Sequence, residues 1–91
     1  MKQRLILMGA DGPRAERYVY LEDSGDRVEI GRVVPRTIRT HTSDGRAQHA
    51  NTWEAIDLEG TSHGDRWLTN WEAARALLRG IAAKLAKKEA N

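Results

Sequence analysis

The sequence predicts an α+β fold in which a four- or five-stranded antiparallel sheet, a meander with a protruding β-ribbon, packs on one C-terminal helix. Two observations predict it. Runs rich in β-branched and aromatic residues alternate with turn signals over residues 3–58. After a helix-capping sequence, apolar residues then recur every three or four positions. The 91 residues show no linker and no internal repeat, so we expect a single domain, residues 1–91.

Residues 1–34 are predicted to form a meander of three strands. The segment QRLILM, residues 3–8, is apolar on both faces, which is typical of a central strand. RYVYLE, residues 17–22, is a second strand, and a turn at residues 23–26 joins it to RVEIGRVV, residues 27–34. Pro35 has no N–H to donate, so the third strand should end or bend there.

Residues 35–51 are predicted to form a basic hairpin arm. RTIRTHT, residues 36–42, is rich in β-branched residues, and Asp44-Gly45 is the signal of a tight hairpin turn. Apolar residues resume at Trp53, where the returning leg should rejoin the sheet. Residues 52–68 are therefore predicted to form a returning strand and a loop.

Residues 69–88 are predicted to form the C-terminal helix, beginning at Asn70. Thr69 and Glu72 have the spacing of a capping box, in which each side chain accepts a hydrogen bond from the other residue's amide. The apolar stripe predicted to lie on the sheet comprises Trp71, Ala74, Leu78, Ile81 and Leu85, and Leu77 widens it.

A second face of this helix carries small residues, which allow two helices to approach closely. These residues are Ala73, Ala76, Gly80 and Ala83. Two interpretations remain open. The face is either a homodimer contact or a solvated surface made of good helix formers.

The charge and the composition of the chain exclude several kinds of site and several classes of protein. Formal net charge is +2, yet residues 32–51 hold four arginines and one carboxylate, whereas residues 52–65 hold four carboxylates and no lysine or arginine. With no cysteine, disulfides, thiolate nucleophiles and cysteine zinc sites are excluded. The N-terminal apolar run is too short for a signal peptide, and no window approaches the ~20 apolar residues of a membrane span. We expect a cytoplasmic protein, and the excess of arginine and alanine is typical of a high-GC bacterial or phage gene.

The candidate catalytic and metal-ligating residues do not form a site in the sequence. His41 and His49 would approach each other across the predicted ribbon, but no third ligand is spaced to complete a metal site. Ser62, His63 and Asp65 are too close in sequence to form a nucleophile–base array, which is assembled across a fold. The sequence therefore predicts no metal, no cofactor and no enzymatic activity.

The hairpin arm carries the best candidate for a binding site. Its predicted nucleic-acid-binding residues are Arg32, Arg36, Arg39, Thr40 and Arg46. Guanidinium forks and short hydroxyls contact phosphates and base edges, and a two-stranded ribbon fits the major groove of B-DNA. The alternative is an ordinary exposed hairpin that its charges keep soluble and unpaired.

The segment WEAIDLEGTSHGDRWLTNWEAARALLR, residues 53–79, resembles the end of the arm-type DNA-binding domains of tyrosine recombinases and, more loosely, of HicB-type antitoxin domains. This resemblance implies a small sheet-plus-helix module that binds DNA, and it assigns no individual residue. The second functional class is a protein-binding accessory factor, either an antitoxin or a phage-encoded inhibitor of a host protein, whose charge blocks steer its association.

Overall fold

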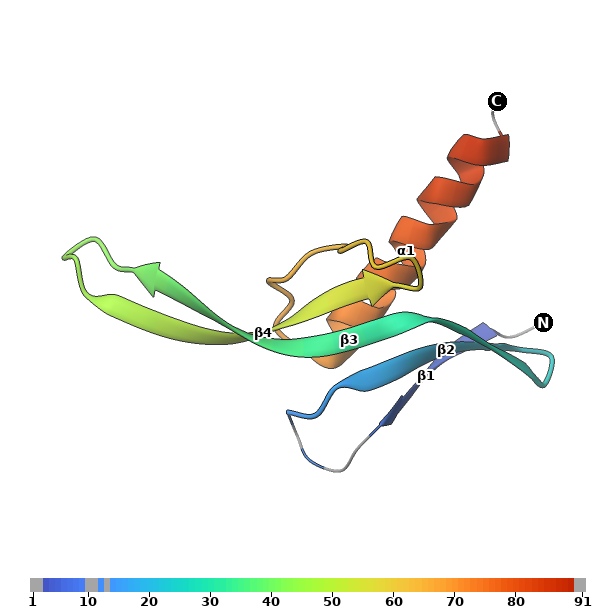
Figure 1. Ribbon diagram of the computed structural model, residues 1–91, viewed down its shortest axis with the longest axis horizontal. Coiled ribbons are helices and arrows are strands. Elements are labelled where there is room, and N and C mark those ends of the chain that lie inside the picture. Colours follow the sequence, from blue (N-terminus) through green and yellow to red (C-terminus); the bar gives the residue numbers. More distant parts are fainter. Residues whose placement is uncertain (1–2, 10–11, 13, 90–91) are drawn as a thin grey trace.

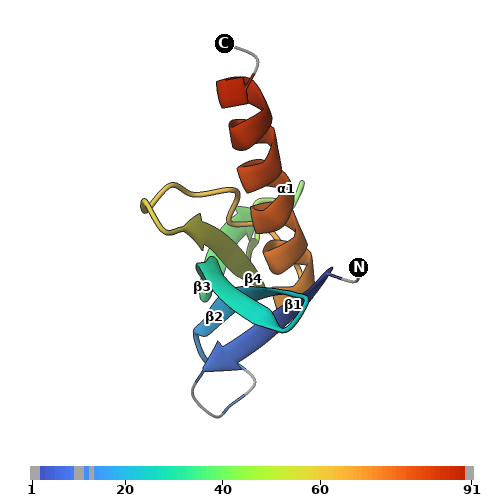
Figure 2. The same ribbon diagram turned by 90° about the vertical axis from the view of Figure 1, so that its right-hand side faces the viewer.

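The computed structural model describes residues 3–9, 12 and 14–89. The elements are β1 (Gln3–Gly9), β2 (Arg17–Asp23), β3 (Asp26–His41), β4 (Ala47–Asp57) and α1 (Asn70–Glu89). The strands form one antiparallel sheet in the order β1-β2-β3-β4. Helix α1 lies on one face of this sheet, and its C-terminal half extends past it (Figures 1 and 2). The α+β fold class predicted from the sequence is confirmed, with four strands in the sheet.

Two tight turns connect the last three strands. Between β2 and β3, Ser24 and Gly25 have φ values of 54° and 88°, the conformation of a two-residue type I′ turn. Between β3 and β4, the N–H of Thr42 donates to the carbonyl of Arg46 at 2.9 Å, and Gly45 has a φ of 85°. Both turns fall where the sequence predicted them.

Pro35 lies within β3, opposite Trp53. The backbone groups of Trp53 bond instead to Trp67, at 2.7 and 3.2 Å, so this pair requires no N–H from Pro35. β2 does not extend as far as Pro35, because it begins at Arg17, which lies opposite Val33. Strand β3 therefore continues through Pro35, which excludes the strand end that the sequence allowed there.

The position of β1 corrects the prediction that it is a central strand. β1 pairs with β2 on one side and lies at the end of the strand order. Its Leu5 and Leu7 pack against the core, whereas Met8, on the opposite face, is 47% exposed. The sequence shows that both faces of this strand are apolar, but hairpin connections decide which strands are neighbours.

The hydrophobic core lies between the sheet and α1, which packs mainly on β3 and β4. Its side chains with no exposed surface are Val19, Val33, Ala55, Ala73, Ala74 and Leu77.

A β-bulge adjusts the sheet beneath the helix. The register between β2 and β3 shifts between Val19 and Tyr20, which leaves Ile30 without an opposite residue. Ile30 is nevertheless 9% exposed and part of the core. At the next position, a Cβ on Gly31 would overlap the carbonyl oxygen of Ile56 and lie 2.8 Å from Cδ2 of Leu77. The absence of a side chain at Gly31 therefore lets Leu77 pack directly on the sheet.

The face of α1 that meets the sheet matches the predicted stripe in part. Ala74 and Leu77 have no exposed surface, and Leu78 and Ile81 pack against the core, as predicted. Trp71 and Leu85 are 45% and 56% exposed, whereas Ala73 and Ala76 are buried. Small side chains lie nearest the sheet because they let the helix backbone approach it closely. The predicted small-residue face is partly covered within the chain: Ala73 and Ala76 are buried and Gly80 lies against the His63 ring, whereas Ala83 is exposed.

The start of α1 follows the predicted capping pattern with one difference. The amide of Glu72 donates to Oγ1 of Thr69 at 3.1 Å. The Glu72 carboxylate accepts from the amide of Leu68 at 3.1 Å, one residue earlier than the capping box predicted. The helix begins at Asn70, as expected.

Residues 61–67 run along the outer edge of β4. Isolated bridges join Trp53 to Trp67 and Ile56 to Ser62. This segment satisfies backbone groups of β4 without forming a regular fifth strand. It therefore closes one edge of the sheet next to α1.

Candidate functional site

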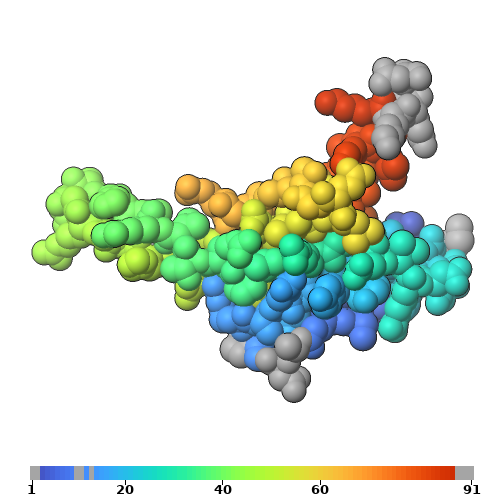
Figure 3. Space-filling view, viewed as in Figure 1, coloured from blue at the N-terminus to red at the C-terminus, as the bar shows by residue number. Residues whose placement is uncertain are grey.

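The candidate site is the arm, which we define as residues 35–51. Beyond Val33, where β2 ends, β3 and β4 continue as a two-stranded ribbon to the pair His41–Ala47. The arm projects from the rest of the molecule in Figures 1 and 3 and contributes to its longest extent of 50 Å. We call the rest of the fold the body.

The five predicted site residues do not share one surface. Side chains alternate between the two faces of a strand, so Arg32, Arg36 and Thr40 lie on the face opposite α1. Arg39 lies on the other face, directly opposite His49 in the register. Arg46 belongs to the turn at the tip. The structure therefore divides the predicted site residues between the two faces of one ribbon and its tip.

Most of these arginines have an acidic neighbour within the chain. Arg32 pairs with Glu16 at 3.0 Å and Arg36 with Glu54 at 2.8 Å. At the tip, Arg46 lies 3.5 Å from Asp44. All three arginine side chains are about half exposed or more. Exposed ion pairs contribute only about 0–1 kcal/mol, so an external anion can compete for them.

Arg39 differs from the other site arginines. It makes no ion pair or hydrogen bond with the residues that the structure describes. His49 lies opposite it, and His41 lies two positions along the same face. The two histidines are thus diagonal neighbours across the ribbon, and the described residues contain no group of three or more side chains able to hold a metal ion.

Arg14, at the base of the arm, is a candidate that the sequence did not indicate. Its guanidinium lies over the Trp53 ring, 5.4 Å from the ring centroid. It also donates hydrogen bonds to the carbonyl of Arg36 at 2.9 Å and to that of Thr52 at 3.3 Å. Arg14 precedes β2, far from the arm in sequence, so only the fold brings its charge there.

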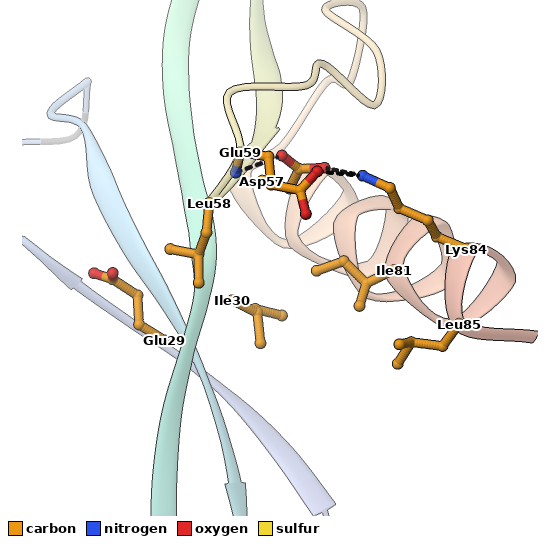
Figure 4. A pocket seen from close by; sticks show the side chains of 8 residues that line it. All are labelled: Glu29, Ile30, Asp57, Leu58, Glu59, Ile81, Lys84 and Leu85. Atoms are coloured by element: carbon orange, nitrogen blue, oxygen red, sulfur yellow. Dashed lines mark hydrogen bonds and ion pairs between the residues drawn. The ribbon is translucent and has the colours of Figure 1, made fainter. Parts of the chain in front are cut away.

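A second polar cluster joins the end of β4 to the helix. One oxygen of Asp57 accepts from the amides of Glu59 and Thr61, both at 2.9 Å. The other lies 2.9 Å from Nε2 of His63 and 3.8 Å from Nζ of Lys84. Figure 4 shows Asp57 and Lys84 at the rim of a pocket whose wall is formed by apolar side chains of β3 and α1.

These contacts join the loop that follows β4 to helix α1. Burial alone would raise the pKa of the Asp57 carboxyl. The hydrogen bond from His63, the two backbone amides and the Lys84 charge outweigh burial, so the pKa lies below its ordinary value. Nδ1 of His63 faces Gly80, and the His63 side chain is 15% exposed.

No family model matches the chain, and neither do any of the curated proteins or solved structures with which it was compared. In the described part of the chain, no helix is long and apolar enough to cross a membrane.

Proposed function

We propose that this chain is a small, non-enzymatic binding protein of the cytoplasm that binds duplex nucleic acid through the arm. The observation that carries the proposal is the arm itself: past Val33 the β3–β4 pair leaves the body as a ribbon without a third strand. Nothing in the core requires strands of this length, because every fully buried side chain lies in the body.

The dimensions of a two-stranded ribbon suit this function. Neighbouring strands lie about 4.8 Å apart, and the major groove of B-DNA, about 12 Å wide, admits such a ribbon with its side chains. In that position one ribbon face meets the base edges, and the tip and edges meet phosphates. Arg39 on one face, Arg36 and Thr40 on the other, and Arg46 at the tip supply donors for either orientation.

The charges of the arm support the same partner. Between Thr37 and Asn51 the sequence holds Arg39 and Arg46 against the single carboxylate Asp44. Arg14 adds a guanidinium at the base of the arm. The resemblance of residues 53–79 to arm-type DNA-binding domains points to the same partner on sequence grounds alone.

Salt-dependent binding of labelled duplex DNA tests the proposal. The double variant Arg39→Ala/Arg46→Ala removes up to two phosphate contacts, so the log–log salt slope should become shallower by up to about 1.8. Affinity at low salt should fall accordingly. Fluorescence anisotropy across a salt series measures both quantities.

The matched control is Arg75→Ala/Arg79→Ala, which removes the same charge from exposed positions of α1. We expect this control to retain the parent salt slope. If the parent shows no binding at low salt, or both double variants weaken binding equally, the arm is not a nucleic-acid interface. Comparing Arg36→Ala with Arg39→Ala then identifies which ribbon face meets the bases.

A protein partner is the second candidate, and the ion pairs favour it. Arg32 and Arg36 are already neutralised by Glu16 and Glu54, which reduces the positive field offered to DNA. The same sheet face exposes Tyr18 and Met8, each by 47%, and arginine, tyrosine and methionine are enriched at protein interfaces. A complex that survives nuclease treatment and high salt would favour this candidate over nucleic acid.

A further inference from the structure

We propose that two copies of this chain associate through the outer edge of β1, forming one continuous eight-stranded sheet with both helices on the same face. No strand of the described chain pairs with that edge. Such an edge is a template for strand addition unless proline, a bulge or an inward-pointing charge protects it. The sequence of β1, QRLILMG, contains no proline, its register with β2 has no bulge, and its one charge, Arg4, is paired with Glu22 at 2.8 Å.

Hydrogen bonds in the body determine which backbone groups of β1 point outward. Trp53 and Ala55 bond to the adjoining loop, so their N–H and C=O groups point away from β3. These directions alternate along an antiparallel strand, and the alternation extends through the register to β1. The β1 residues whose backbone groups face away from β2 are Gln3, Leu5, Leu7 and Gly9.

In one antiparallel register all four of these outward-facing residues have a partner. If Ile6 lies opposite Ile6 of the second copy, Leu5 lies opposite Leu7 and Gln3 lies opposite Gly9. Every outward-facing residue then meets another outward-facing residue, so the whole strand pairs. The two-fold axis through Ile6 is perpendicular to the sheet, which places both α1 helices on one face.

The positions of the side chains are compatible with this register. Arg4 is opposite Met8 of the second copy, so the two Arg4 charges lie at opposite ends of the seam. On the helix side, a groove beside Trp71 is lined by Gln3, Leu5 and Leu21. Because Leu5 pairs with Leu7 of the second copy, the half-exposed Trp71 ring would be covered from across the seam.

The proposal also explains why β1 has the sequence of a central strand. Leu5 and Leu7 pack against the core, and the opposite face of β1 also carries two apolar side chains, Ile6 and Met8. An edge strand rarely needs two apolar faces. Pairing with a second copy makes β1 an interior strand.

A pair of charge substitutions at Met8 tests this register. Met8→Lys places a lysine opposite Arg4 of the second copy, and Met8→Glu places a carboxylate there, each occurring twice in the dimer. We expect Met8→Lys to weaken and Met8→Glu to tighten the dimer by about 2- to 30-fold, from cross-strand pair energies. Sedimentation equilibrium over a concentration series measures the dissociation constant.

The matched controls are Val28→Lys and Val28→Glu, which place the same charges at a residue of β3 that is 61% exposed. They should leave the dissociation constant unchanged. A parent that is monomeric at several hundred micromolar overturns the proposal, leaving the edge free for a strand of another protein. A dimer whose affinity is insensitive to charge at Met8 overturns it too, because the contact then lies elsewhere.

Hydrogen exchange provides an independent readout at single residues. The amides of Leu5 and Leu7 point outward, so their protection should rise with protein concentration as the seam forms. The amide of Ile6 points toward β2 and should be protected at all concentrations. Equal behaviour of these three amides would contradict the proposed seam, whatever the oligomeric state.

Discussion

The body and the arm are built from the same two strands, β3 and β4, yet they are held together by different interactions. In the body, the pair Val33–Ala55 is completely buried beneath Leu77. In the arm, the same ladder continues through the pair Arg39–His49, where both side chains are exposed. The backbone pairing is continuous, but burial ends where the arm begins.

Because of this difference, the arm should contribute less to the stability of the chain than the body does. A two-stranded ribbon is at best marginally stable by itself, so the arm depends on its anchorage to the body. The contacts of Arg14 with Trp53 and with the carbonyl of Arg36 lie at that junction. Substitutions in the body should therefore change the free energy of unfolding, whereas substitutions toward the tip should leave it nearly unchanged.

The largest expected effect comes from Leu77, the largest side chain with no exposed surface. Leu77→Ala should cost about 2–5 kcal/mol, because it removes buried methyl groups and leaves a cavity. The comparison in the arm is Ile38→Ala, at a half-buried position opposite Ala50, which should cost clearly less. Denaturant midpoints at equal m values measure the difference, and similar losses would show that the arm contains a core of its own.

Asp57 should have the next largest effect. Asp57→Ala leaves the amides of Glu59 and Thr61 without their acceptor, at a cost of about 1–3 kcal/mol if water does not replace it. Asp44→Ala, at the exposed tip of the arm, is the control and should cost less.

The pH dependence of Asp57 has a definite direction. Its pKa is lower in the folded chain than the unfolded value of about 3.9, so its contribution is complete above that value. The contribution is lost as the pH falls through the lower folded pKa. Unfolding free energies measured between about pH 5 and 2 should therefore decline less steeply for Asp57→Asn than for the parent.

Local signals in the sequence predicted most of the fold. Gly25 and Gly45 identified the hairpins, because glycine adopts the positive φ of these turns without steric cost. Thr69 and Glu72 identified the start of the helix. The helix orientation was predicted only in part: the apolar period selected the buried Ala74 and Leu77, but it also selected Trp71, which is 45% exposed.

Long-range contacts account for what the sequence did not show of the site. The acidic partners of Arg32 and Arg36 are Glu16 and Glu54, and their pairing depends on which strands are neighbours. Arg14 reaches the arm only through the β1–β2 connection. The sequence predicted a ribbon between residues 35 and 51. That Arg36 and Arg39 face opposite sides is a local property, because residues three apart on a strand lie on different faces.

Gly80 offers a test in which local propensity and tertiary contact have opposite effects. An alanine gains about 1 kcal/mol over glycine within an exposed helix. Here its Cβ would overlap the His63 ring, and overpacking costs about 1–3 kcal/mol. We expect Gly80→Ala to lose up to about 2 kcal/mol, read from denaturant midpoints.

The double variant separates the two effects at Gly80. In a His63→Ala background the overlap is removed, so Gly80→Ala should then stabilise the chain by about 1 kcal/mol. A double-mutant cycle gives the coupling between the two positions. Identical effects in both backgrounds would mean that His63 does not occupy this place in solution.

Thr69 supplies a smaller effect at the helix start. Thr69→Ala removes the acceptor for the Glu72 amide and should cost about 1 kcal/mol. The matched substitution in the arm is Thr37→Ala, whose hydroxyl has only the exposed Asn51 side chain as its partner, at 3.3 Å. Thermal unfolding of the two variants compares them directly, and an equal loss would show that the cap adds nothing beyond a surface hydrogen bond.

The smallest effect on stability is expected where the largest effect on binding is proposed. Arg39→Ala and Arg46→Ala alter exposed side chains of the arm, one without an ion pair to the described residues and one with a weak contact at 3.5 Å. Each should change the free energy of unfolding by no more than about 0.5 kcal/mol. Chemical denaturation of both variants, run on the samples used for anisotropy, checks this expectation. A loss above about 1 kcal/mol would exceed what exposed substitutions ordinarily cause, and it would mean that the arm packs against the body in solution and is not a free ribbon.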